Sequence, residues 1–130
     1  MFHHREYGKT TILRDLIRKI STGIEKLEFK GINVGLVDER GEIAAMYKGI
    51  PQNDIGLRTD VLENIPKPVG IKMLIRSMAP QIVAADEIGT YEDVVAIKEA
   101  VCSRSKGNIY STWANKRRSY SKSSIKRTYL

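Results

Sequence analysis

The stretch that decides the fold is Gln81-Ile82-Val83-Ala84-Ala85-Asp86-Glu87, a short apolar run that ends in two carboxylates. A second run of the same kind is Asn33-Val34-Gly35-Leu36-Val37-Asp38, which is followed by Glu39 and Arg40. Continuous apolar runs of this length are typical of strands buried on both faces, as in parallel sheets. We therefore expect two buried strands whose carboxyl ends carry acidic side chains.

Helical spacing of apolar residues flanks both runs and predicts helices over residues 10–20, 69–78 and 91–101, with Val94 among the inward residues of the third. Strands that alternate with helices imply a mainly parallel sheet flanked by helices, so the predicted fold class is α/β. Between these elements, residues 42–47 suit one or two helical turns. Residues 49–70 are rich in Gly, Pro, Asn and Asp and are expected to be largely loop, and such a long loop tends to be functional.

The charge of the chain is divided unevenly. Residues 1–103 contain 14 Lys and Arg against 15 Asp and Glu, a net of −1, whereas residues 104–130 contain 8 basic residues and no acidic one, a net of +8. The body therefore offers no nucleic-acid surface, and the basic tail has a composition that suggests disorder, although residues 108–112 suit weak pairing at a sheet edge. We divide the chain into a core, residues 1–103, and a tail, residues 104–130.

Length and composition exclude several classes of protein. One hundred and thirty residues suit one domain, and the single cysteine, Cys102, excludes a disulfide framework or a cysteine-rich metal site. No apolar run approaches the roughly 20 residues that cross a bilayer, and no signal peptide is recognisable. His3 and His4 lack partners at the spacing of metal ligands. We expect a soluble, cytosolic protein.

The segment Gly8-Lys9-Thr10-Thr11 resembles the end of a phosphate-binding loop. In the pattern G-x-x-x-x-G-K-[ST], glycines let the backbone N–H groups surround a phosphate, lysine reaches its oxygens and the hydroxyl ligates Mg²⁺. The position of the first glycine holds His3, and the triplet alone is weak evidence, since a solvated helix start has the same sequence. Asp86 and Glu87 strengthen it, because P-loop ATPases end a strand in one carboxylate for Mg²⁺ and a second beside the attacking water.

Other polar residues are candidates for the same site. Asp38, Glu39 and Arg40 end the first strand, where open α/β sheets present ligand residues, although a surface ion pair explains them equally well. Arg58 with Asp60, and Arg76, stand near the same loops in the sequence, and Arg40, Arg58 or Arg76 is suited to stabilise γ-phosphate charge. Spacing alone does not assign that role.

Four blocks of the sequence closely resemble the stage III sporulation protein AA family. They are residues 37–44, residues 49–62, residues 75–80 and residues 86–89. The family is similar to RecA-type P-loop ATPases of the secretion and pilus motor kind. The resemblance implies ATP hydrolysis with Mg²⁺ in the mother-cell cytoplasm, a hexamer, and partners among the other stage III sporulation channel proteins at the membrane, without specific nucleic-acid binding.

Carried over by position, the resemblance gives roles to five residues. Lys9 and Thr10, with Gly8 and Thr11, would hold phosphate and Mg²⁺, Asp86 would support Mg²⁺, and Glu87 would position water. The chain departs from the family at residues 4–7, where the family has Pro-Pro-Gly-x before Gly-Lys-Thr-Thr. Arg5, Glu6 and Tyr7 would crowd the phosphate and Glu6 would repel it, so we expect weak ATP binding at most.

A second departure begins at Arg104, where the family continues into a strand and a Thr-x-His-Gly segment. Codons can be chosen for residues 4–8 and for residues 104–113 such that a shift of one base restores the family's peptides in both places. We therefore hypothesise a truncated reading frame that is shifted at both ends, which the nucleotide sequence tests.

Two other functions fit the sequence. A small basic protein would grip nucleic acid or an anionic membrane through Tyr and Trp side chains among the Lys and Arg of the tail, and deletion of residues 104–130 would then abolish binding. A scaffold that does not hydrolyse ATP is the other, and a Glu87→Gln test in a full-length homologue separates it from an enzyme.

Overall fold

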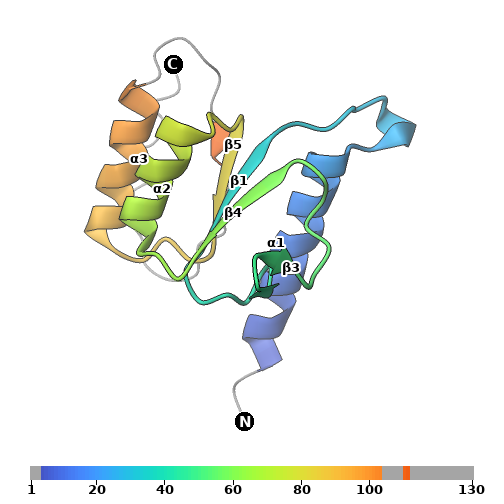
Figure 1. Ribbon diagram of the computed structural model, residues 1–130, viewed down its shortest axis with the longest axis horizontal. Helices are drawn as coiled ribbons and strands as arrows, with labels where there is room; N and C mark the ends of the chain where they lie inside the picture. The colour runs from blue at the N-terminus through green and yellow to red at the C-terminus, as the bar shows by residue number, and fades with distance from the viewer. Residues whose placement is uncertain (1–3, 104–109, 112–130) are drawn as a thin grey trace.

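The computed structural model describes residues 4–103 and 110–111, which form a parallel sheet flanked by helices (Figure 1). The sheet has the strand order β4-β1-β5-β6, and each neighbouring pair is parallel. Its strands are β1 (Val34–Asp38), β4 (Thr59–Glu63), β5 (Ile82–Ala85) and β6 (Tyr110–Ser111). The α/β fold class expected from the sequence is confirmed.

Helices cover both faces of this sheet. α2 (Lys67–Ser77) and α3 (Tyr91–Ser103) lie on one side, and α1 (His4–Thr22) lies on the other (Figure 1). Successive side chains of a strand point to opposite faces, so Leu36 packs with Ile17 of α1 whereas Val37 packs with Leu74 of α2. All five residues of β1 are buried, as expected for the strand between the two helical layers.

Three predicted elements differ from the structure. Residues 42–47 are not helical. The last two of them form β2 (Met46–Tyr47), which makes a hairpin with β3 (Ile50–Pro51). Residues 49–70 contain β4, which sequence reasoning missed because only Val61 and Leu62 form its apolar run. Val94 is 53% exposed, since α3 turns Ile97 and Ala100 toward α2 and the sheet.

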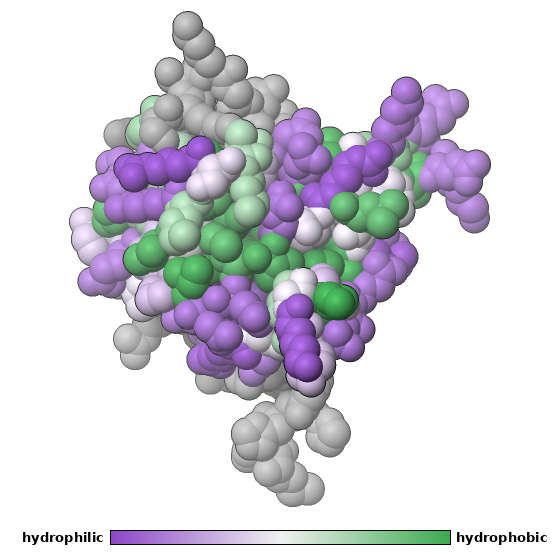
Figure 2. Space-filling view, viewed as in Figure 1, coloured by the Kyte–Doolittle hydropathy of each residue, from purple (hydrophilic) through white to green (hydrophobic). Residues whose placement is uncertain are grey.

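The chain between α1 and β1 projects from the body of the protein. The 3-10 helix η1 (Glu25–Leu27) sits in this segment, and backbone hydrogen bonds between Ile24 and Phe29 close its base. Figure 2 shows it as a hydrophilic protrusion, while apolar side chains gather over the middle of the same face.

The end of α1 is fixed to the start of β4. The Ser21 hydroxyl accepts the Arg58 N–H at 2.7 Å, and the Arg58 guanidinium donates to the Ser21 carbonyl at 3.2 Å. Gly56 passes so close that a Cβ there would lie 2.6 Å from the Ser21 Cβ, and its φ is +86°. Only glycine fits this approach without strain.

We expect Gly56→Ala to lower the free energy of unfolding by about 3 kcal/mol, because it adds a steric clash to an unfavourable backbone conformation. Gly49→Ala is the matched control: its φ is +77°, but no atom lies within 4 Å of the added Cβ. It should cost only about 1 kcal/mol, the backbone part of the effect. Urea denaturation measures both, and equal losses would contradict the close approach of Ser21.

Candidate functional site

The carboxyl ends of the parallel strands bring together acids that are far apart in the sequence. β1 ends at Asp38, and in the sheet register Val37 lies beside Ala85 of β5. Glu39 therefore follows β1 at the same edge where Asp86 and Glu87 follow β5. This is the edge at which open α/β sheets bind ligands.

Asp38 is fully buried and serves as the anchor of the turn that follows β1. Its carboxylate accepts backbone N–H groups from Glu42 at 3.1 Å and Ala44 at 2.9 Å, and from Ile43 at 3.3 and 3.2 Å to its two oxygens. These bonds occupy both oxygens of the carboxylate. Asp38, a candidate ligand in the sequence, is thus committed to backbone structure.

The carbonyl groups of the same turn are held from the other side. Arg14 of α1 donates from Nε to the Ile43 carbonyl at 2.7 Å and from Nη2 to the Glu42 carbonyl at 2.8 Å. Asn53 donates to the Ile43 carbonyl at 2.9 Å. The turn is fixed because its N–H groups donate to Asp38 and its carbonyls accept from Arg14 and Asn53. Glu39 and Arg40 lie at its exposed tip.

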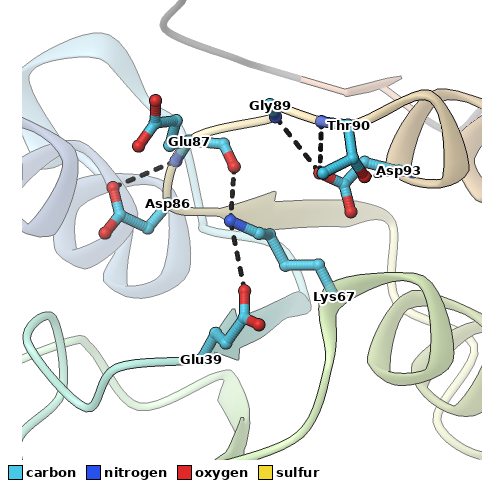
Figure 3. Close-up of polar contacts among 7 residues, drawn as sticks. All are labelled: Glu39, Lys67, Asp86, Glu87, Gly89, Thr90 and Asp93. Atoms are coloured by element: carbon cyan, nitrogen blue, oxygen red, sulfur yellow. Dashed lines mark hydrogen bonds and ion pairs between the residues drawn. The ribbon is translucent and has the colours of Figure 1, made fainter.

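Lys67, the first residue of α2, joins the two acidic strand ends. Its ammonium lies 3.3 Å from Glu39 Oε2 and also donates a hydrogen bond to the backbone carbonyl of Glu87 (Figure 3). Only 14% of the Lys67 side chain is exposed, compared with 43% of Glu39. This partly buried cation was not predicted from the sequence.

The loop after β5 is shaped by its own side chains. Asp86 Oδ1 accepts the N–H of Glu87 at 3.0 Å, and the exposed Glu87 carboxylate points away from Lys67 (Figure 3). Thr90 and Asp93 then form a reciprocal cap on α3, in which Asp93 Oδ2 accepts the N–H groups of Gly89 and Thr90, and Thr90 Oγ1 accepts the N–H of Asp93. Glu87 is therefore available to solvent on a well-defined loop.

The segment Gly8-Lys9-Thr10-Thr11 does not form a loop in this structure. α1 begins at His4, so these four residues lie within the helix. From the fifth residue of an α-helix onward, backbone N–H groups donate to carbonyls one turn earlier and do not point at a ligand. Gly8 and Lys9 are exposed, but this backbone does not fit as a phosphate cradle.

The remaining candidate arginines lie at the opposite end of the sheet. Arg58 precedes β4, and its carbonyl accepts the N–H of Val34, the first residue of β1. Arg76 is in the last turn of α2, which leads to the amino end of β5. Asp60 is exposed on β4 opposite Gly35. We call the sheet edge that carries Glu39, Asp86 and Glu87 the acidic edge. The structure brings Arg40 to this edge, but not Arg58, Arg76 or Asp60.

The Asp15 carboxyl lies outside this edge, although its environment perturbs it. Hydrogen bonds from Arg18 and Lys19 on the same helix lower the pKa of Asp15. Pairs three and four residues apart on an exposed helix face are a common feature of helices. The lowered pKa of Asp15 therefore results from ion pairs within α1 and does not indicate a catalytic or binding site.

Residues 4–103 and 110–111 contain neither a cluster of metal-binding side chains nor a helix suited to cross a membrane. Within these ranges, no three His, Cys, Asp or Glu side chains gather closely enough to hold a metal ion. The helices described there also lack the length and apolar character needed to cross a membrane. The acidic edge would suit Mg²⁺ only with additional oxygen ligands, such as those of a phosphate.

Comparison with known sequences decides the family. The profile described as sporulation stage III, protein AA, matches residues 3–117. The chain belongs to the stage III sporulation protein AA family. Stage III sporulation protein AA of Bacillus subtilis (strain 168) is 51% identical over 94 residues, which cover 72% of this chain and 30% of that protein. The chain thus spans about a third of the length of this relative. No solved structure matches the chain.

The family profile reaches further along the chain than the blocks recognised in the sequence. The four blocks lie between residues 37 and 89, whereas the profile matches residues 3–117 and so includes the start of the tail. In this part of the chain, the structure describes β6, which pairs in parallel with β5. The edge pairing expected within residues 108–112 is therefore present. The basic tail otherwise lies outside the described residues, and the shifted reading frame stays a prediction.

Sequence reasoning missed three residues that organise the site. Arg14 carries no local signal for its partners, whereas Thr90-x-x-Asp93 has the spacing of a helix cap. Lys67 also carries a local signal. A lysine in the first turn of a helix opposes the helix dipole, so it stands out against the usual preference for acids there.

Proposed function

We propose that this protein acts in spore formation as part of an ATP-binding and ATP-hydrolysing protein. That protein would energise or assemble a membrane channel complex between the mother cell and the forespore. The main support is the meeting of Glu39, Asp86 and Glu87 at one sheet edge, in a chain of the stage III sporulation protein AA family. The N-terminal turns of α1, which carry Gly-Lys-Thr-Thr, lie toward the same end of the molecule (Figure 1).

The proposed roles follow the family resemblance. Lys9 and Thr10 would bind phosphate and Mg²⁺, Asp86 would support Mg²⁺, and Glu87 would hold the water. Arg40 is the arginine that the fold places at this edge, so it is the best candidate for contact with a γ-phosphate. Bound Mg-ATP would supply the phosphoryl group and the remaining metal ligands.

As it stands, the chain is impaired in this function. Residues 8–11 are helical, so their backbone N–H groups are engaged within α1. A phosphate would meet the Lys9 ammonium alone, without the surrounding N–H groups that make phosphate loops tight. The acidic edge would also repel a nucleotide in the absence of Mg²⁺.

Partners and location follow the same proposal. We expect the other stage III sporulation channel proteins as partners, in the mother-cell cytoplasm at the membrane surface, and a hexamer in the intact protein. A basic binding protein is the second candidate, on the strength of the +8 net charge of residues 104–130.

Titration calorimetry with Mg-ATP tests the proposal. We expect the 130-residue chain to bind with a dissociation constant above about 1 mM, which corresponds to at most about 4 kcal/mol of binding free energy. The longer Bacillus subtilis relative is the comparison, and we expect it to bind far more tightly. Tight binding by this chain would contradict the impairment, and absence of binding by the relative would contradict the ATP-dependent function itself.

A further inference from the structure

The ammonium of Lys67 occupies a position that is electrostatically unfavourable for a lysine. It begins α2, where the helix dipole is positive, and the first turn contains no acidic residue. Its side chain is also largely buried, and an unpaired buried charge is costly. The contacts with Glu39 and with the Glu87 carbonyl must offset these costs, so both matter for keeping Lys67 in place.

The surrounding backbone restricts where this side chain can reach. Lys67 stands between Pro66 and Pro68, whose rings limit the local backbone conformations. α2 is itself fixed by Gly70, whose Cα packs so closely on Val37 of β1 that an added Cβ would lie 2.8 Å from Val37 Cγ1. The start of α2 is therefore a firm support from which Lys67 contacts two other segments.

Those two segments are the ones that carry the acidic edge. Glu39 belongs to the turn fixed by Asp38 and Arg14, whereas Glu87 belongs to the loop between β5 and α3. The bond from Lys67 holds the carbonyl of Glu87, and the Glu87 carboxylate points to the other side (Figure 3). A single ammonium thus connects segments 48 residues apart in the sequence, from 39 to 87.

We propose that Lys67 is a positioning residue that ties the Glu39 turn to the Asp86–Glu87 loop and thereby fixes the direction of the Glu87 side chain. Its importance for ATP hydrolysis rests on the proposed function, but the tie itself does not. If Lys67 connects the two segments, a change at Glu39 must alter the motion of the Asp86–Glu87 loop, because Lys67 contacts both Glu39 and that loop. A lysine that only stabilised the fold would not transmit such a change.

Hydrogen exchange of the backbone amides of residues 86–90, measured in the full chain without nucleotide, tests the tie. We expect Lys67→Met to speed this exchange about tenfold, the size expected for loss of a charge-assisted hydrogen bond. Glu39→Gln should speed it about threefold, since it removes the ion pair and leaves the bond to Glu87. Lys67→Arg, which keeps the charge and the donors, should restore exchange to within about twofold of the original protein.

Lys72→Met is the matched control, because Lys72 lies on the same helix and pairs with Glu99 of α3 at 2.7 Å. It should leave the exchange of residues 86–90 unchanged. The tie is refuted if Glu39→Gln has no effect on that loop, or if Lys72→Met has the same effect as Lys67→Met. If Lys67→Met does not fold, Glu39→Gln and Lys67→Arg still decide the question. None of these measurements involves ATP, so their failure leaves the proposed function standing, and failure of ATP binding by the relative leaves the tie standing.

Discussion

Replacement of Asp38 by alanine is expected to lower the free energy of unfolding by about 5 kcal/mol, as measured by urea denaturation. The substitution leaves the backbone N–H groups of Ile43 and Ala44 without their acceptor in the interior, and that of Glu42 without it at a partly buried position. Each unsatisfied buried donor costs about 1–3 kcal/mol, and bonds to a charged acceptor are at the upper end. A loss of this size is a large share of the stability of a small domain, which is typically about 5–15 kcal/mol.

Two further variants distinguish the effect of losing the Asp38 carboxylate from the effect of losing any negative charge. Asp60→Ala removes a carboxylate from an exposed position on β4, and should change stability by no more than about 0.5 kcal/mol. Asp38→Asn keeps one acceptor oxygen but turns an NH₂ group toward N–H donors, so its effect should fall between the two. A loss below about 1 kcal/mol for Asp38→Ala would show that the turn does not depend on this carboxylate.

The role of Asp38 illustrates what the sequence reveals and what it leaves hidden. An apolar run that ends in acids predicts both β1 and β5, because the hydrophobic effect demands burial of such runs wherever the chain goes. It does not reveal which acid at a strand end is structural. Asp38 is buried because residues 42–44 fold back over it and Arg14 holds them there, and these contacts depend on α1 packing against the sheet.

The same reasoning applies to the elements that were missed. β4 has a weak apolar signal and becomes a strand by pairing in parallel with β1, which is a tertiary effect. The helical spacing predicted α1 from residue 10, but its start at His4 was not foreseen. Gly8 to Thr11 were expected to end a phosphate loop, yet the segment before Gly8 lacks the glycines and prolines that would stop a helix from forming there.

That difference leads to the prediction with the largest effect on function. The combined substitutions His4→Pro, Arg5→Pro, Glu6→Gly and Tyr7→Val restore the family's loop before Gly8. We expect them to tighten Mg-ATP binding at least about 100-fold, or about 2.7 kcal/mol, in titration calorimetry. Two adjacent prolines oppose helix formation there, so that α1 would begin near Gly8 with free N–H groups at its positive end. Loss of Glu6 also removes a negative charge that repels phosphate.

Lys9 provides the control for this gain. In the restored loop, Lys9→Ala should abolish most of the improvement, because the ammonium adds a charge-assisted contact to phosphate oxygens. In the unaltered chain the same substitution should change little, since residues 8–11 are helical and we expect them to bind phosphate weakly. Circular dichroism should report a shorter α1 in the restored variant. If affinity does not rise, or rises equally without Lys9, then Gly8 to Thr11 is the start of an ordinary helix and not the remnant of a phosphate loop.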